Sequence, residues 1–253
     1  MAPRARGAVS LVAYVLHHYD WSESSLILDL WTREHGRLAV AAKGAKRPHS
    51  QLRAVLLPFQ RLHATLGRAA TDSAPEVQTL RAAERAGGAP MPTGDALFSG
   101  FYCNELLMKL VARNDPHPAL FDAYALTLPR LAAEETGAQC ALRAFELTLL
   151  RETGVLPDLS LLTLTQQPLQ PGQVYALDPE AGVSPAHAGI ASQTWVALEA
   201  ALSAANFDAL CGACRPALPE LRGMLRATLQ YHLGSYALHT REVLLDAQRL
   251  QGP

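Results

Sequence analysis

The stretch LILDLWTREHGRLAVAAKG, residues 26–44, decides the fold of the N-terminal part of the chain. It holds two short apolar runs, 26–32 and 37–44, which a Glu-His-Gly turn separates. In both runs leucine or valine alternates with other residues, as in strands that face a core on one side. The stretch therefore predicts a β-hairpin.

Further strand patterns lie on both sides of this hairpin. Residues 8–16 form an apolar run that ends in a polar loop, 17–25, and strand-like texture returns at 59–67 and 76–84. Between the third and fourth strands, residues 51–58 allow one helical turn before a proline. Five short strands in this order are typical of the OB-fold, a five-stranded β-barrel. An SH3-like barrel would have strands of similar length and stays an alternative.

Positive charge is concentrated around the hairpin. Residues 33–68 contain eight Lys or Arg and one Glu, a net charge of +7, although the whole chain has a net charge of −1. A local field of this kind attracts polyanions, because their condensed counterions are released on binding. A solvated surface is the alternative, but the cations are interleaved with apolar and turn residues, which favours nucleic-acid binding.

An OB-fold barrel binds oligonucleotides on the face of strands 2 and 3 and with the loops that join strands 1–2 and 4–5. Trp21 lies in the first of these loops, where it could stack on an unpaired base or be tucked into the core. We call residues 33–68 the basic window. The residues that we expect at a DNA surface are this aromatic, seven of the eight cations of the basic window and one histidine: Trp21, Arg33, Arg37, Lys43, Lys46, Arg47, His49, Arg53 and Arg68.

After a linker rich in glycine and proline, 86–94, the pattern changes to helix. Apolar residues then recur at three- and four-residue spacing, most clearly in residues 137–157. Residues 155–192 contain five prolines and predict an irregular segment with short strands or turns at most. The fold class is therefore α+β, with an OB-fold domain over 1–86 and a mainly helical domain over 92–253. The remaining helices are expected at 95–113, 117–135, 193–202, 218–233 and 239–250.

Composition limits the class of protein. The chain is 49 % hydrophobic and 18 % charged, as in globular proteins. No apolar run reaches the roughly 20 residues that span a bilayer, and the N-terminus lacks the core and cleavage site of a signal peptide. Four cysteines are too few for a secreted disulfide framework. We therefore expect a cytoplasmic protein.

One cysteine pair, Cys211 and Cys214 in CGAC, has the spacing of half a zinc site or of a redox dithiol. No second pair accompanies it, so two ordinary thiols are the simpler interpretation and we expect neither structural zinc nor another cofactor. No nucleophile elbow, HExxH or phosphate-binding loop is present. The sequence therefore predicts a protein that is not an enzyme.

Arg143 lies on the most apolar predicted helix, beside Leu142 and Phe145. At the edge of an apolar groove it could receive a peptide carboxylate through charge-assisted hydrogen bonds. An ordinary salt bridge to a neighbouring helix is the alternative.

Several motifs together resemble the RecO recombination-mediator family of bacteria. They are the core AKGAKRPHS at 42–50, the LLPF that follows it, the LRAFEL of the third helix and the terminal TREVLLDAQRL. These motifs occur in order at suitable separations, and the resemblance covers nearly the whole chain. The resemblance implies a non-enzymatic DNA-repair protein with an OB-fold and a helical domain, found in the cytoplasm with the nucleoid.

The resemblance also implies partners. Members of the family bind single- and double-stranded DNA, anneal complementary strands, contact the acidic tail of single-strand binding protein (SSB), and act with RecR to load RecA. Carried onto this chain, the basic window corresponds to the DNA surface, and Arg143 with Phe145 beside it corresponds to the site for the SSB tail. Some members hold zinc with two CxxC pairs, of which this chain keeps one. A generic OB-fold RNA-binding factor and a thiol or zinc protein built on CGAC are the alternatives.

Overall fold

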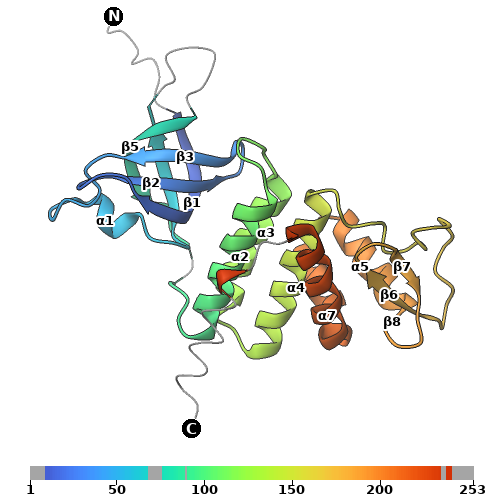
Figure 1. The fold of residues 1–253 in the computed structure, drawn as a ribbon. Coiled ribbons are helices and arrows are strands. Elements are labelled where there is room, and N and C mark those ends of the chain that lie inside the picture. The colour runs from blue at the N-terminus through green and yellow to red at the C-terminus, as the bar shows by residue number, and fades with distance from the viewer. Residues whose placement is uncertain (1–8, 68–75, 89, 235–237, 241–253) are drawn as a thin grey trace, which may run out of the picture. The chain divides into compact units, whose positions relative to one another are not determined.

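The computed structural model describes residues 9–67, 76–88, 90–234 and 238–240. Two compact units make up the chain (Figure 1). The first comprises Met1–Met91 and Val111–Phe121, and the second comprises Pro92–Leu110 and Asp122–Pro253. The segment Val111–Phe121 therefore belongs with the barrel, whereas the sequence places it in the helical domain.

The first unit is a closed five-stranded barrel with the strand order β1-β2-β3-β5-β4. Only the β3–β5 pair is parallel, and the other pairs are antiparallel. This is the topology of an OB-fold, so the predicted fold class is confirmed. The elements are β1 (Val9–Asp20), β2 (Leu26–Thr32), β3 (Gly36–Ala42), the short helix α1 (Leu52–Val55), β4 (Arg61–Leu66) and β5 (Val77–Arg85).

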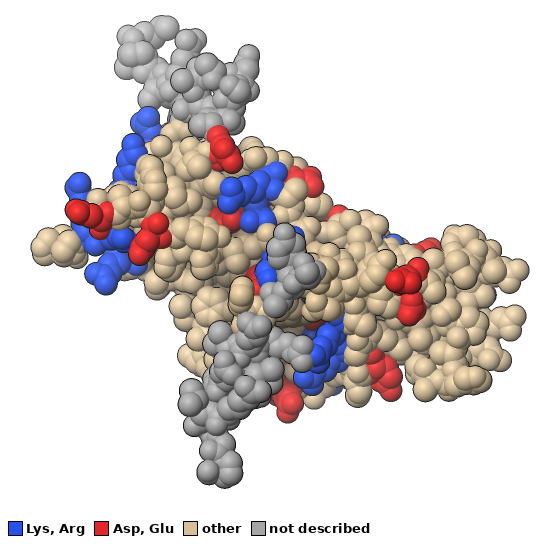
Figure 2. All heavy atoms as spheres, viewed as in Figure 1, with Lys and Arg blue, Asp and Glu red and all other residues tan. Residues whose placement is uncertain are grey.

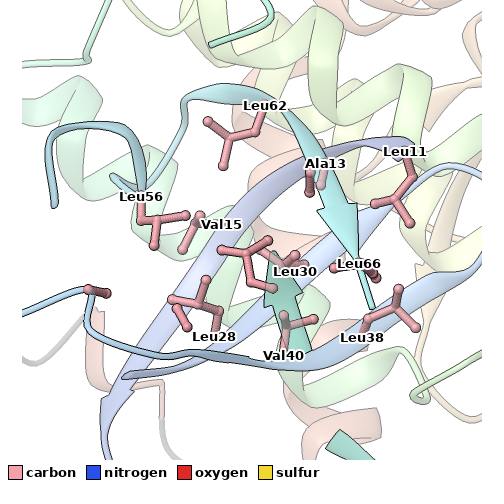
Figure 3. Close-up of a cluster of buried hydrophobic side chains, with 14 residues drawn as sticks. Leu11, Ala13, Val15, Leu28, Leu30, Leu38, Val40, Leu56, Leu62 and Leu66 are labelled. Atoms are coloured by element: carbon pink, nitrogen blue, oxygen red, sulfur yellow. The ribbon is translucent and has the colours of Figure 1, made fainter. Parts of the chain in front are cut away.

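The barrel closes around side chains that point inward at every second strand position. In β4 the buried residues Leu62, Ala64 and Leu66 alternate with exposed or half-buried ones. Burying a leucine of this kind stabilises a fold by roughly 1.5–3 kcal/mol. Figure 3 shows the resulting cluster, to which all five strands, Ala45 and Leu56 contribute: Leu11, Ala13, Val15, Leu28, Leu30, Leu38, Val40, Ala42, Ala45, Leu56, Leu62, Ala64, Leu66 and Leu80.

The first strand differs from the predicted one. The sequence places a polar loop at 17–25, but β1 continues to Asp20 because β2 keeps pairing with it. Alternation fails as a signal here, since residues 17–20 are all exposed. The predicted hairpin at 26–44 is present, with its turn between Thr32 and Gly36.

The segment Val111–Phe121 packs against the outside of the barrel. The Phe121 ring lies 5.5 Å from that of Tyr14 and 6.3 Å from that of Trp31, measured between centroids. Gly36 has φ 65°, and a Cβ built on it would lie 2.0 Å from the carbonyl oxygen of Asp115. This position therefore requires glycine both for its backbone angle and for the close approach of the segment.

The second unit is mainly helical. Its irregular stretch between residues 155 and 192 contains a small sheet with the strand order β7-β6-β8. Pro129 lies one residue before the end of its helix. In the described part of the chain, no helix is long and apolar enough to cross a membrane. The elements are α2 (Asp95–Leu110), α3 (Pro118–Arg130, whose first turn is counted with the barrel), α4 (Glu135–Glu152), β6 (Val174–Asp178), β7 (Gly182–Pro185), β8 (Ile190–Ala191), α5 (Ser192–Ser203), α6 (Phe207–Cys214) and α7 (Leu218–Leu233).

The predicted last helix, from His239, lies mostly outside the described residues. Its first two residues are held by Glu105 of α2, whose carboxylate accepts hydrogen bonds from the backbone N–H groups of His239 (2.9 Å) and Thr240 (3.0 Å). Partial burial raises the pKa of Glu105, but the hydrogen bonds from Thr240 and His239 together outweigh burial, so the pKa lies below its usual value.

Candidate nucleic-acid interface

Two loops meet at one end of the barrel. Because Leu26 at the start of β2 pairs with Ala42 at the end of β3, the β1–β2 loop lies beside the loop that follows β3. A hydrogen bond of 2.9 Å from the backbone N–H of Lys46 to the carbonyl oxygen of Ser24 fastens the two loops together. Trp21 and the cations after β3 are therefore neighbours in space, as the OB-fold interpretation predicts.

We call the surface formed by the β1–β2 loop and by residues 43–53 after β3 the loop end of the barrel. Trp21 is 55 % exposed. Lys46 is half-buried, and its ammonium group lies 3.1 Å from the carboxylate of Asp20. Figure 2 shows Lys and Arg side chains gathered at the end of the barrel that carries α1, with Asp and Glu among them. The remaining predicted DNA contacts of the loop end are all exposed: Lys43, Arg47, His49 and Arg53.

Arg33 is exposed, but it lies at the other end of the barrel. It occupies the β2–β3 turn next to the Thr32–Gly36 pair, six strand positions from the Leu26–Ala42 pair. At about 3.3 Å per residue, this separates Arg33 from the loop end by roughly 20 Å. Arg68, the predicted contact from the β4–β5 loop, lies outside the described residues.

Arg37 is not on the surface, which corrects the prediction. It is 7 % exposed, and its guanidinium group makes two hydrogen bonds to the carboxylate of Asp29, at 2.7 and 3.2 Å. A third bond, of 2.7 Å, runs to the carbonyl oxygen of Val111. Asp29 is 1 % exposed and has a second cation, Arg113, at 3.6 Å. Burying a carboxylate requires such a partner, so Arg37 is committed to the protein interior.

The outer face of β3 is buried along the whole strand, and that of β2 is buried except at Ile27, which is half-buried. Every residue of Gly36–Ala42 is buried, including those that point away from the barrel core. The backbone N–H of Asn114 donates to the carbonyl oxygen of Arg37 at 2.9 Å, which holds the covering segment in place. The expectation that Arg37 contacts oligonucleotides on this face is therefore wrong, whereas Arg33 and Lys43 are exposed beyond the strand ends.

The expected DNA surface also leaves out several exposed side chains of the barrel. Tyr19 is 45 % exposed at the end of β1, next to the exposed His17 and His18. Elsewhere on the barrel, Arg61 of β4 and Arg81 of β5 are exposed. The alternating pattern of β4 predicts that Arg61 is exposed, since the next position is buried. No pattern in the sequence indicates that β1 extends through Tyr19.

In the helical unit, Arg143 and Phe145 are interior residues, which also corrects the prediction. Arg143 is 5 % exposed, and its Nη2 atom lies 2.8 Å from a carboxylate oxygen of Glu146 on the same helix. The hydroxyl of Tyr102 donates to the same oxygen at 2.7 Å. Phe145 is fully buried, with its ring 6.2 Å from that of Tyr124. The prediction that these two side chains contact a peptide is therefore wrong, because neither is accessible.

This buried pair is imperfectly satisfied. Within the described residues, the Nε atom of Arg143 and the Oε2 atom of Glu146 have no hydrogen-bond partner. Burial raises the pKa of Glu146, and the charges of Arg143 and Arg222 and the Tyr102 hydroxyl oppose that rise. Arg222 is on α7 and is itself exposed.

The cysteine pair lies on α6. Cys211 is half-buried and Cys214 is buried, and both are free thiols. Burial raises the pKa of Cys211 to about 11 and raises that of Cys214 further. Zinc binding and thiol exchange both need the thiolate, which these environments disfavour. In the described ranges, no three His, Cys, Asp or Glu residues gather closely enough to hold a metal ion.

Fold and surface define the class: an OB-fold protein with an exposed cationic and aromatic loop end and an appended helical unit. Comparison with known proteins gives the family. The model "Recombination protein O N terminal" matches residues 8–84, and "Recombination protein O C terminal" matches residues 91–242. Together they cover most of the chain, which therefore belongs to the recombination protein O (RecO) family.

Curated relatives agree with this assignment. The chain is 51 % identical over 244 residues to "DNA repair protein RecO" of Polaromonas sp. (strain JS666 / ATCC BAA-500), with 94 % of this chain and 96 % of the relative covered. It is 49 % identical over 260 residues to the protein of the same name from Variovorax paradoxus (strain S110), with the same coverage. The predicted family is confirmed.

Proposed function

We propose that this protein is a non-enzymatic recombination mediator in DNA repair. It binds single- and double-stranded DNA and anneals complementary strands, and with RecR it helps to load RecA onto DNA coated with SSB. The observation that carries the proposal is the loop end, where the loop of an exposed tryptophan is hydrogen-bonded to a loop with exposed cations. Membership of the RecO family, whose curated members are named DNA repair proteins, supports it.

Annealing follows from electrostatics without a catalytic group. Two strands repel each other through their phosphates, and a cationic surface that neutralises some of these phosphates lowers the repulsion. Lys43, Arg47 and Arg53 provide three such charges at one end of the barrel. The protein would act without a metal or another cofactor, in the cytoplasm at the nucleoid.

For the SSB tail, we propose the exposed cations near the buried Arg143–Glu146 pair. Arg222 and Arg226 are both exposed on α7, one helical turn apart. The charge of Arg222 acts on Glu146, which places it close to the buried pair. An acidic peptide with a free carboxylate would be held there by charge-assisted hydrogen bonds, while Arg143 supports the helix from inside.

The experiment that tests the function compares two variants in two assays. The barrel variant is Lys43→Ala/Arg47→Ala/Arg53→Ala, and the helical variant is Arg222→Ala/Arg226→Ala. Annealing of complementary fluorescent oligonucleotides is measured in about 0.1 M salt, and binding of an acidic peptide with a free C-terminus is measured separately. Losing three phosphate contacts should reduce DNA affinity on the order of 100-fold, and the rate of annealing with it.

We expect the barrel variant to lose annealing and to keep peptide binding, and the helical variant to do the opposite. Annealing that survives in the barrel variant would contradict the proposal. Tighter binding of RNA than of DNA of the same sequence would favour the alternative of an RNA-binding factor.

A further inference from the structure

The end of β1 projects beyond one of its neighbours. β1 pairs with β4 over Val9–Tyr14, but its pairing with β2 continues to Asp20. A register shift just before His17 increases the local twist at this point. Within the part of the chain that the structure describes, residues 17–20 therefore pair with β2 alone, and all four of their side chains are exposed.

Residues 17–20 and the loop after them carry the exposed aromatic rings of the barrel unit. Tyr19 is 45 % exposed and Trp21 is 55 % exposed. The imidazole of His17 lies edge-on to the Tyr19 ring at 4.5 Å, and the imidazole of His18 stacks on that of His17 at 5.9 Å. The other described Phe, Tyr and Trp rings of the unit are at most 4 % exposed: Tyr14, Trp31, Phe59 and Phe121.

The loop that holds Trp21 is fixed at several points. The backbone N–H of Trp21 donates to the carbonyl oxygen of Ser25 at 3.3 Å, which closes the loop on itself. The Oγ atom of Ser25 accepts a bond of 3.3 Å from the backbone N–H of Gly44. Lys46 joins the loop by its backbone bond to Ser24 and by its ion pair with Asp20. A ring held in place before binding loses less conformational entropy when a ligand arrives.

Cations and exposed rings therefore occur together at the loop end. Lys43 and Arg47 are exposed on the loop to which the Trp21 loop is fastened. Proteins that bind single strands combine these two groups, because the cations follow the phosphates and each unpaired base has a π-face that can stack on an aromatic ring. In a duplex the bases already stack on one another, so the rings gain nothing there.

We propose that Tyr19 and Trp21 form a base-stacking platform that makes the loop end selective for unpaired bases of single-stranded DNA over duplex DNA. The proposal rests on the proposed DNA-binding function and adds a strand preference and the two residues that set it. Lys43 and Arg47 contact the phosphates of either kind of DNA, and the two rings distinguish one from the other.

The test uses the full chain and three ligands at one salt concentration: an oligothymidylate of about 16 nucleotides, an abasic oligonucleotide with the same number of phosphates, and a duplex. The wild type should bind the oligothymidylate most tightly. Trp21→Ala should weaken that binding roughly tenfold and leave the other two affinities unchanged. Trp21→Phe keeps an aromatic face and should retain most of the preference.

Fluorescence gives a second reading of the same contact. Trp31 and Trp195 are both fully buried, so a base can stack only on Trp21 among the three tryptophans. Oligothymidylate should quench the emission of the wild type, and Trp21→Phe should remove the quenching. Tyr231→Ala is the matched control, since Tyr231 is 51 % exposed on α7 of the helical unit and should leave binding and quenching unchanged.

Three outcomes would overturn the proposal. Equal wild-type affinity for the oligothymidylate and the abasic ligand would show that DNA binding is purely electrostatic, and the proposed function would stand without the platform. A strand preference that persists in Tyr19→Ala/Trp21→Ala would assign the rings to another partner, such as a protein. Failure of the wild type to bind any of the three ligands would remove the proposed DNA-binding function itself.

Discussion

Two regions of the barrel carry arginines that the sequence assigns to DNA, and their environments differ completely. On the outer face of β2 and β3, Arg37 is buried and bound to Asp29. At the loop end, Lys43, Arg47 and Arg53 are exposed. The difference shows that the position of a cation along a strand matters as much as its charge. A cation within a strand, such as Arg37, can be covered by another segment, whereas the three cations beyond the end of β3 stay exposed.

A distant part of the chain causes this difference. Val111–Phe121 covers the β2–β3 face, and the guanidinium group of Arg37 holds it through the carbonyl oxygen of Val111. The carboxylate of Asp29 makes the burial of Arg37 possible. Arg37 is therefore part of what holds the barrel unit together, and we expect mutations in the two regions to affect different properties.

The largest effect is expected for Arg37→Ala. It leaves the carboxylate of Asp29 buried with Arg113, at 3.6 Å, as a more distant ion-pair partner, which should lower the free energy of unfolding by about 3 kcal/mol. Chemical denaturation measures this loss, and Arg53→Ala, as the exposed control, should change stability by less than about 0.5 kcal/mol. At a temperature where both variants are folded, Arg37→Ala should bind DNA like the wild type. If Arg37→Ala kept its stability and lost DNA binding, Arg37 would be a DNA contact and not a structural residue.

Arg143→Ala extends the comparison to the helical unit, with a slightly smaller effect. It leaves Glu146 buried, but the Tyr102 hydroxyl still donates to it, so we expect a loss of roughly 2–3 kcal/mol in the free energy of unfolding. Arg222→Ala, on the exposed side, should cost less than about 0.5 kcal/mol. If Arg143→Ala abolished acidic-peptide binding without any loss of stability, the structural role assigned to Arg143 would be contradicted.

The smallest effect compares the two ends of the barrel. Arg47→Ala should weaken DNA binding about fivefold in 0.1 M salt, the contribution of one phosphate contact to a single strand. Arg33→Ala should change DNA affinity by less than about twofold, because Arg33 lies roughly 20 Å from the loop end. Fluorescence anisotropy with one labelled oligonucleotide measures both variants. Equal losses would mean that DNA runs along the whole barrel.

Local patterns were sufficient to predict most of the fold. The hairpin at 26–44, the fourth and fifth strands and the helical second part all follow from alternation, turn residues and helical spacing. The extension of β1 over residues 17–20 could not be predicted in this way, because its side chains are all exposed and only the backbone pairing with β2 makes it a strand. The closing of the β2–β3 face depends on a segment more than 70 residues away, as in the bond from Arg37 to Val111.

The candidate site shows the same division. The loop cations and Trp21 could be located from turn residues and from the order of the strands, since a loop residue has few ways to become buried. Arg37 and Arg143 could not be assigned, because an arginine in a regular element looks the same in sequence whether it faces solvent or a buried carboxylate. Tyr19 falls in the predicted polar loop at 17–25, and its side chain gives no sign that β1 continues through it.

The most direct test of the central claim, that DNA affinity belongs to the loop end, is a salt titration of single-stranded DNA binding by the wild type and by Lys43→Ala/Arg47→Ala. The slope of log K against log salt should become shallower by about 1.4 in the variant, since each lost phosphate contact removes about 0.7. A variant whose slope and affinity equal those of the wild type would contradict the account.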